Sequence, residues 1–240
     1  MSLPVPPSVS PSVDPSSAPR VRVWDLPTRL FHVALAVSVV GSVVTANIGG
    51  NAMAWHFRFG YLIFALLLFR LLWGFVGGRW SRFGQFLYHP VVVWRFVRGQ
   101  SAPAGVHWDV GHSPLGALSV WALLVGLAVQ VGTGLMADDD IANAGPWVQF
   151  VSSATSRLAT GWHTNTGQYL VMGLVALHVA AILFYRWRGQ NLVTAMITGD
   201  KHLPLSVPPS QDGPRHRLLA ALLLAASAGV VAGLIGLGTA

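Results

Sequence analysis

The sequence contains no cysteine, and only 10% of its 240 residues are charged. Without thiols the chain cannot form disulfides, cysteine-held iron–sulfur clusters or the covalent attachment of a c-type haem, so any haem would be held without a covalent link. The shortage of charge accompanies 53% hydrophobic residues and a mean hydropathy of +0.56. That balance is too apolar for a soluble domain of this length, and it predicts an integral membrane protein.

Apolar runs of about 20 residues, the length that crosses a bilayer core, predict an all-α protein with five membrane-spanning helices. Their approximate ranges are 30–46, 55–75, 113–136, 161–187 and 218–237.

The segments between these spans have distinct compositions. Residues 1–19 are rich in Pro and Ser and too poor in apolar residues to fold, which predicts a disordered cytoplasmic tail. The basic and aromatic stretch Pro90–Val97 is expected to lie on the membrane surface, against lipid. We therefore expect a four-helix domain over 20–201, a cytoplasmic linker over 202–217 and an extra helix over 218–240.

The basic residues are distributed unequally around the spans. Of the 15 lysines and arginines, all but Arg58, Arg70 and Arg157 fall in the segments before the first span, between the second and third, and from Arg186 at the end of the fourth span to the fifth. The positive-inside rule assigns those segments to the cytoplasm, which places the N-terminus inside and the C-terminus outside. The net charge of +7 then reflects topology, and binding of nucleic acid is not expected.

Four histidines at membrane depth form two pairs. His32 and His178 both lie near the cytoplasmic ends of their spans, whereas His56 and His163 both open spans on the outer side. In a regular α-helix, His163 and His178 are roughly 22 Å apart along the axis and about 60° apart around it. Facing imidazoles at two depths predict a helical bundle that holds two b-type haems, each with two histidine ligands, which pass electrons and do not bind oxygen.

Other interpretations of these histidines remain open. A lone histidine at a helix end is commonly an interfacial residue bonded to water or to a carbonyl. Zinc or copper also binds imidazole, although a chain without cysteine and with almost no intramembrane carboxylate offers few further ligands. The remaining histidines apart from His112 are expected to be solvated in cytoplasmic loops: His89, His107, His202 and His216.

Three further residues are candidates for contacts to haem. Arg58 and Arg70 follow His56 in the second span, and Arg70 returns to within about 40° of the His56 face. Haem propionates would supply anions for Arg58 at the outer site and Arg70 at the inner one, the alternative being that the arginines reach lipid headgroups. His112, at the mouth of the third span, is a candidate to bond a propionate or to replace His32 as a ligand.

Four motifs resemble the bacterial cytochrome b561 family, which includes the b-type cytochrome subunits of nickel–iron hydrogenases. They occur in the family's order: VWDLPTRLFH (23–32), WHFRFGYLIFALLLFRLLWGFVG (55–77), GHSPLGALS (111–119) and WHTNTGQYLVMGLVALHVAAILFY (162–185). The resemblance covers about 20–201 and implies a four-helix bundle with two bis-histidine b haems in the bacterial inner membrane. It implies His32, His56, His163 and His178 as the ligands.

Two features depart from the hydrogenase subunits of that family. DDDIANAGPW and the later NLVTAMITGDK look more like members encoded beside soluble c-type cytochromes. The fifth span departs from the four-helix pattern, and its Gly229 and Gly233, four residues apart, would permit a homodimer or a partner helix, the alternative being a simple extra anchor.

The sequence supports three functional hypotheses. The first is electron transfer between a membrane quinone and a periplasmic redox partner such as a c-type cytochrome, docked at Asp138–Asp140. The quinone site is not located; Gln130 and Thr133 are polar at membrane depth, for which interhelical hydrogen bonding is the ordinary role. The second is a superoxide-oxidising quinone reductase, which the three acids would disfavour. The third is a membrane anchor for a soluble complex, either a hydrogenase-type cytochrome or a haem-free protein.

Overall fold

The computed structural model describes residues 19–102, 108, 110–203 and 207–238. Five helical stretches within these residues are long and apolar enough to cross a membrane, which confirms the predicted all-α membrane architecture. Their principal helices are α1 (Leu26–Ile48), α2 (Met53–Val76), α4 (Pro114–Leu135), α6 (Gln168–Trp187) and α8 (Pro214–Gly236). Shorter elements are α3 (Pro90–Val97), α5 (Ser153–Gly161), α7 (Leu192–Thr198), β1 (Arg20–Arg22) and β2 (Asp200–His202). The predicted tail, except Pro19, and His107 lie outside the described residues.

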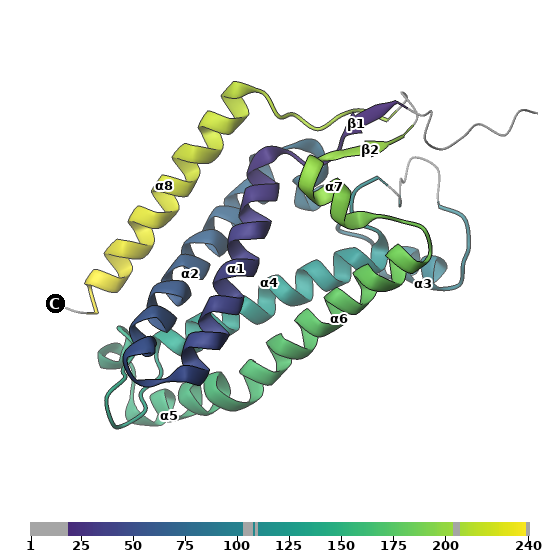
Figure 1. Ribbon diagram of the computed structural model, residues 1–240. Coiled ribbons are helices and arrows are strands. Elements are labelled where there is room, and N and C mark those ends of the chain that lie inside the picture. Colours follow the sequence, from purple (N-terminus) through teal and green to yellow (C-terminus); the bar gives the residue numbers. More distant parts are fainter. Residues whose placement is uncertain (1–18, 103–107, 109, 204–206, 239–240) are drawn as a thin grey trace, which may run out of the picture.

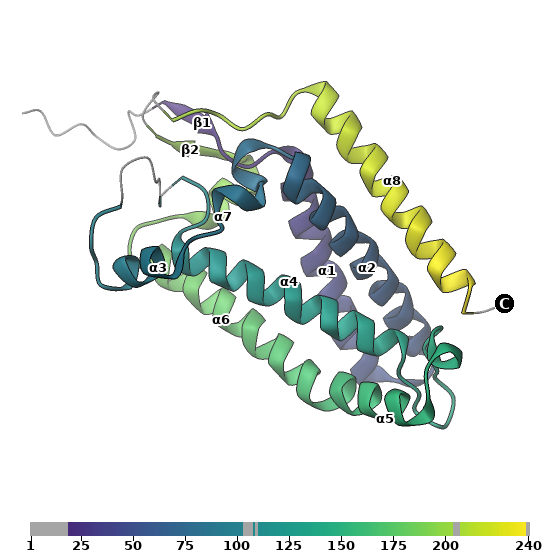
Figure 2. The ribbon, with the colours of Figure 1, turned by 180° about the vertical axis from the view of Figure 1, so that it is seen from behind.

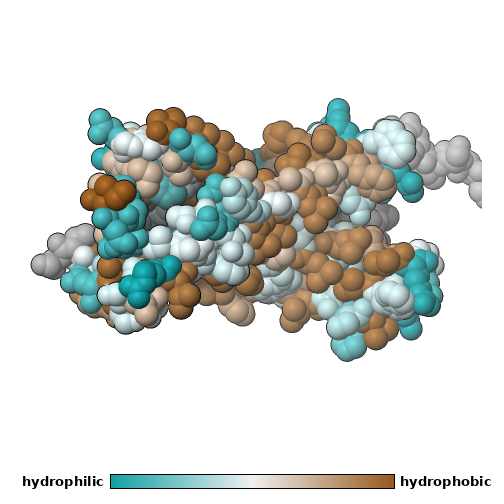
Figure 3. Space-filling model, turned by 90° about the horizontal axis from the view of Figure 1, so that it is seen from below, coloured by the Kyte–Doolittle hydropathy of each residue, from teal (hydrophilic) through white to brown (hydrophobic). Residues whose placement is uncertain are grey.

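Helices α1, α2, α4 and α6 form the bundle, and α8 lies beside it (Figures 1 and 2). Helix α1 packs along α2 and α4 packs along α6, while contacts between α2 and α4 join the two pairs. Hydrophilic residues gather at the two ends of the face in Figure 3, with mainly apolar side chains between them. This arrangement is the one that a bundle needs in lipid, because the spans satisfy their backbone groups internally and expose apolar side chains.

Helix α8 packs against the side of α2 that faces away from α4 and α6. Its buried residues are Ala220, Ser227 and Val231, and Ala220 joins a core cluster with side chains of α1 and α2. Gly229 and Gly233 are exposed, with open space where a Cβ would stand. The close-contact spacing of these glycines is therefore not used within the chain, and the homodimer or partner helix stays a prediction.

A cap of short segments covers one end of the bundle. Strand β1 pairs antiparallel with β2, with Val21 opposite Lys201. The expected linker is packed into this cap, because Ser210 N donates to Arg22 O at 2.7 Å and Val207 is buried. Asp212 also accepts from Leu26 N at 3.0 Å, so the start of α1 is bound to the segment that leads into α8.

The buried carboxylate of Asp25 links the start of the first span to the end of the second. Asp25 caps α1 by accepting from Thr28 N at 2.8 Å, and it also accepts from Trp73 Nε1 at 3.1 Å on α2. Ser81, just after α2, donates its hydroxyl to the other oxygen of the same carboxylate. Each oxygen of the buried acid is thus satisfied, and the relative positions of α1 and α2 are fixed at this end of the bundle.

The fourth span differs from the regular helix that the sequence predicts. It is helical from Ser153, eight residues before the expected start at Gly161, and the six residues Trp162–Gly167 form a π-helical turn between α5 and α6. His163 therefore lies inside a helix. The rotation about the helix axis from His163 to His178 departs from the uniform 100° per residue of an α-helix.

Candidate functional site

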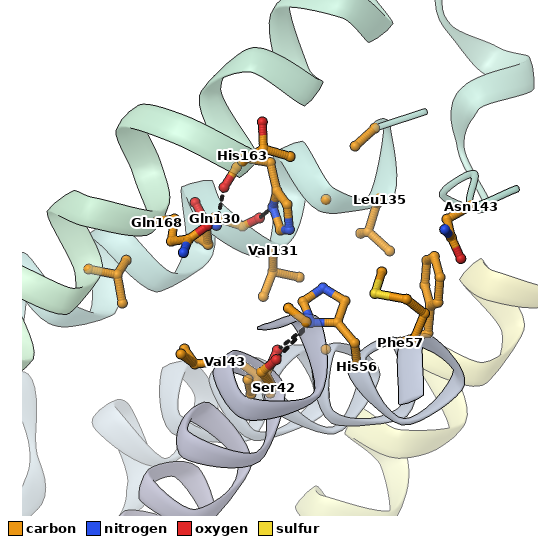
Figure 4. Close-up of a pocket in the computed structure, with 18 of the residues that line it drawn as sticks. Ser42, Val43, His56, Phe57, Gln130, Val131, Leu135, Asn143, His163 and Gln168 are labelled. Atoms are coloured by element: carbon orange, nitrogen blue, oxygen red, sulfur yellow. Dashed lines mark hydrogen bonds between the residues drawn. The ribbon is translucent and has the colours of Figure 1, made fainter. Parts of the chain in front are cut away.

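We call His56 and His163 the outer pair, after the side of the membrane predicted for them. His56 lies in the first turn of α2, and His163 lies in the π-helical turn before α6. The ring centres of His56 and His163 are 5.9 Å apart, and their planes are inclined by 80°. With metal–nitrogen bonds of about 2 Å and about 1.1 Å from each nitrogen to its ring centre, two axial imidazoles place their centres about 6 Å apart. The separation thus fits one metal ion between the two rings, which face each other in Figure 4.

Hydrogen bonds fix which nitrogen each outer ring presents. His56 Nδ1 lies 3.0 Å from Ser42 O, and His163 Nδ1 lies 2.8 Å from Gln130 O (Figure 4). Because a carbonyl can only accept, Nδ1 carries the hydrogen in both rings, and Nε2 is left with its lone pair. A carbonyl behind the ring is the usual way in which proteins orient a metal-binding imidazole and raise its donor strength.

A cavity of about 340 Å³ surrounds the outer pair, in the size range of cofactor pockets. Besides the histidines, residues of all four bundle helices line it, including Val39, Gly60, Leu127, Val131 and Val171. Gly134 on α4 is required for the ring position, because a Cβ there would lie 2.6 Å from His163 Cε1. The cavity is mainly apolar, as a porphyrin ring requires.

The inner pair joins α1 to α6. The ring centres of His32 and His178 are 6.3 Å apart with planes inclined by 53°, which again fits one metal ion between them. Within the described part of the chain, neither ring is hydrogen-bonded to a protein atom, in contrast to the outer pair. No group of three or more histidines or carboxylates that could hold a bare metal ion occurs among the described residues.

Unpartnered polar nitrogens are buried at the inner end of the bundle. Arg70 is only 3% exposed; its Nη2 donates to Ser81 O at 3.0 Å, but its Nη1 has no partner in the part of the chain that the structure describes. The guanidinium carbon lies 4.8 Å from the ring centre of Phe83, which is also 4.8 Å from the ring centre of Trp121. Trp121 Nε1 is buried and has no partner among the described residues. Buried donors without partners are costly, so this end of the bundle fits an acceptor such as a propionate.

His112 lies in the same aromatic cluster. Its ring centre is 4.7 Å from that of Trp24 and 4.5 Å from that of Phe86, and its buried Nδ1 has no hydrogen-bond partner among the described residues. Burial, followed by the positive charges of Arg70 and Lys201, lowers the pKa of His112 to about 3. The ring is therefore neutral at physiological pH, and it can bond a polar group but adds no charge.

Arg58 and Thr133 make local contacts instead of facing a histidine pair. Arg58 is exposed, and its guanidinium carbon lies 4.7 Å from the ring centre of Trp55, one turn away on α2. It is not among the described residues that line the outer cavity, and its predicted contact with an outer haem stays a prediction. Thr133 Oγ1 donates within its own helix, to Val129 O at 2.8 Å and to Gln130 O at 3.1 Å.

The acidic loop lies at the outer cavity. Asp139 and Asn143 line that cavity, and the Asp139 carboxylate accepts from the backbone N–H of residues 141 to 143 and from Asn143 Nδ2. These hydrogen bonds, from Asn143 first, hold the pKa of Asp139 far below its usual range. Ile141 at the loop tip is 90% exposed. One of the three predicted docking acids thus shapes the loop itself.

Sequence reasoning identified the four histidines but missed what holds two of them. Ser42 gave no signal, because it acts mainly through a backbone carbonyl that every residue possesses. Gln130 did give one: an amide at membrane depth needs a partner. The π-helical turn has no signature in WHTNTG that we can identify.

Comparisons with known proteins give a consistent family. A family model described as prokaryotic cytochrome b561 matches residues 23–199. Among curated proteins, a probable Ni/Fe-hydrogenase B-type cytochrome subunit of Bradyrhizobium diazoefficiens is 24% identical over 222 residues, which cover 76% of this chain and 86% of that protein. No solved structure matches.

Proposed function

Because the chain belongs to the prokaryotic cytochrome b561 family, we propose that it carries electrons across the membrane through two non-covalently bound b haems, one at each histidine pair. Membership of the family shows that the protein is a multi-pass membrane b-type cytochrome that takes part in electron transfer. The single observation that supports two haems is the pair of imidazole separations, 5.9 and 6.3 Å, at two levels of the same bundle.

At the outer site, His56 and His163 are the proposed axial ligands. Haem iron would supply one-electron chemistry, and the protein's residues would hold the ring, exclude water and set the potential. The carbonyls of Ser42 and Gln130 keep the hydrogen on Nδ1 and orient Nε2 into the cavity. A haem held by these two histidine nitrogens would pass electrons and would not bind oxygen, which favours electron transfer over catalysis.

At the inner site, His32 and His178 are the proposed ligands, with Arg70 and His112 placed to bond propionates. The unpartnered nitrogens of Arg70 and His112 support this assignment, because a carboxylate would satisfy them. His112 is packed between Trp24 and Phe86, which favours this role over direct ligation of iron.

The finer function we propose is electron exchange between the membrane quinone pool and a redox protein on the periplasmic side of the bacterial inner membrane. The excess of basic residues at the capped end favours the cytoplasm for that end, with the C-terminus outside. A c-type cytochrome is the proposed outer partner, since the acidic loop lies beside the outer cavity and would attract its basic face. The negative charge of this loop would repel superoxide, which disfavours the alternative function of a superoxide-oxidising quinone reductase.

A hydrogenase is the second candidate partner. It is favoured by the similarity to the Bradyrhizobium protein, a probable Ni/Fe-hydrogenase B-type cytochrome subunit. In that case the outer haem would accept electrons from the soluble enzyme. Reduction of the purified protein by a hydrogenase, but not by a c-type cytochrome, would favour this candidate.

A pyridine haemochrome assay on the purified chain tests the proposal. We expect two b haems per chain, falling to one in His56→Ala or His163→Ala, and to one in His32→Ala or His178→Ala. The matched control is His89→Asn at an exposed position, where Asn preserves the cap that His89 Nδ1 provides to Val91 N, and two haems should remain. A colourless wild-type protein would contradict the proposal, as would loss of haem on any other pairing of these histidines.

A further inference from the structure

Two residues hold each other by hydrogen bonds that run in opposite directions. His163 Nδ1 donates to the backbone oxygen of Gln130 at 2.8 Å, and Gln130 Nε2 donates to the backbone oxygen of His163, also at 2.8 Å (Figure 4). The first bond orients the imidazole. The second bond fixes the backbone that carries the imidazole, so the ring and its helix are both tied to α4.

The second bond reaches the chain within the π-helical turn, Trp162–Gly167. Single π-helical turns within α-helices are rare and occur frequently at functional sites. A side chain that bonds the backbone of a neighbouring helix is a recognised cause of such local departures from α-helical geometry. The Gln130 amide is therefore part of what places His163 at its observed height and rotation.

Two glycines make room for this arrangement. A Cβ at the buried Gly167 would overlap both Gln130 Oε1 and Trp162 Nε1, and a Cβ at Gly134 would lie 2.6 Å from His163 Cε1. Both positions thus have to lack a side chain if the amide and the ring are to lie as they do. The inner pair has no comparable arrangement among the described residues, since neither His32 nor His178 is hydrogen-bonded there.

We propose that Gln130 is a positioning residue that, with Gly167, locks the plane of His163 nearly perpendicular to that of His56. The inference rests on the proposed function, because it takes His163 to be a haem ligand. The observed angle between the two planes is 80°. The electron paramagnetic resonance (EPR) spectrum of a low-spin ferric haem depends on the angle between its axial imidazole planes, so the lock has a spectroscopic readout that mere folding does not have.

The test uses the full-length, haem-loaded protein and the variant Gln130→Met. Methionine matches the length of glutamine but has no donor for His163 O, while the backbone acceptor at 130 is retained. We expect two haems per chain, a smaller largest g value for the outer haem, and a changed outer midpoint potential with the inner one unchanged. The matched control, Gln149→Met, makes the same chemical change at an exposed glutamine whose amide donates to Leu237 O and which does not line the outer cavity, and it should leave both signals unaltered.

Gly167→Ala supplies the second arm, because its methyl group displaces the Gln130 amide without removing it. We expect the same EPR shift, and the double variant should shift no further than either single variant. If Gln130→Met fails to retain the outer haem, Gly167→Ala alone decides the question. Two haems with an unshifted outer signal in Gly167→Ala would overturn the inference and leave the two-haem proposal standing, whereas fewer than two haems in the wild type would refute that proposal first.

Discussion

The two histidine pairs differ in the hydrogen bonds that orient their rings and in the charges that lie near them. At the outer pair, backbone carbonyls hold both rings and no arginine lines the cavity among the described residues, while a carboxylate does. At the inner pair, no carbonyl of the described residues is hydrogen-bonded to either ring, and the buried cation of Arg70 lies at that end of the bundle. One site fixes its ligands, and the other fixes the charge around them.

This difference has a direct electrochemical consequence. A carbonyl bonded to Nδ1 makes the imidazole a stronger donor, which favours ferric iron and lowers the potential. A buried cation favours the added electron of ferrous iron and raises the potential. We therefore expect the outer haem to have the lower potential, so that transfer from the outer to the inner end is favourable before the membrane potential is counted.

Removing one ligand from each pair isolates the two sites and gives the largest effect. His178→Ala should retain only the outer haem, and His163→Ala only the inner one, because each loses an axial nitrogen. Redox titration of the two single-haem proteins should give the lower midpoint potential in His178→Ala. Equal potentials, or the reverse order, would contradict the comparison.

Replacing the buried cation should affect the inner haem alone. Arg70→Met removes a charged donor to Ser81 O, which costs about 2 kcal/mol of stability, and should lower the inner midpoint potential. The melting temperature, which should fall, and the midpoint potential would be measured on the same preparation. Arg70→Lys, which keeps the charge, is the matched control and should retain most of the potential. If the midpoint potential of the outer haem shifted instead, Arg70 would be assigned to the wrong haem.

Acid should loosen the cap at the inner end through Asp212. Although burial raises the pKa of Asp212, the hydrogen bonds from Arg217 and Leu26 N outweigh it and lower the pKa below the ordinary 3.8. A carboxyl with a lowered folded pKa stabilises the fold above its unfolded pKa, and that stabilisation is lost as the pH falls through the folded value. Melting curves between pH 7 and pH 3 should therefore show a smaller acid loss for Asp212→Asn than for the wild type; parallel curves would exclude this role.

The smallest effect is expected for the Ser42 hydroxyl. Its Oγ lies 3.1 Å from His56 Nδ1, but the carbonyl of the same residue already accepts at 3.0 Å and remains in Ser42→Ala. We expect a stability loss below about 1 kcal/mol and an outer potential close to that of the wild type. A large shift would mean that the hydroxyl, and not the carbonyl, holds His56.

Some of the site could be predicted along the chain and some could not. The depths of His32, His56, His163 and His178 follow from their positions in apolar runs, and the structure brings them together in the predicted pairs. Arg58 and Arg70 show the limit of that reasoning. They lie on the same predicted span, yet Arg70 is buried at the inner end and Arg58 stacks on Trp55 at the exposed surface.

The sequence by itself determined the five apolar spans and their order, because a run of about 20 apolar residues is what crosses a bilayer core. Only the tertiary structure decided which carbonyl lies behind each imidazole, where the π-helical turn falls and which face of α2 receives α8. Those features depend on how far each helix is rotated and how closely its neighbour approaches. Packing between residues distant in the sequence sets both, and Gly134 and Gly167 matter only because a ring and an amide come close to them.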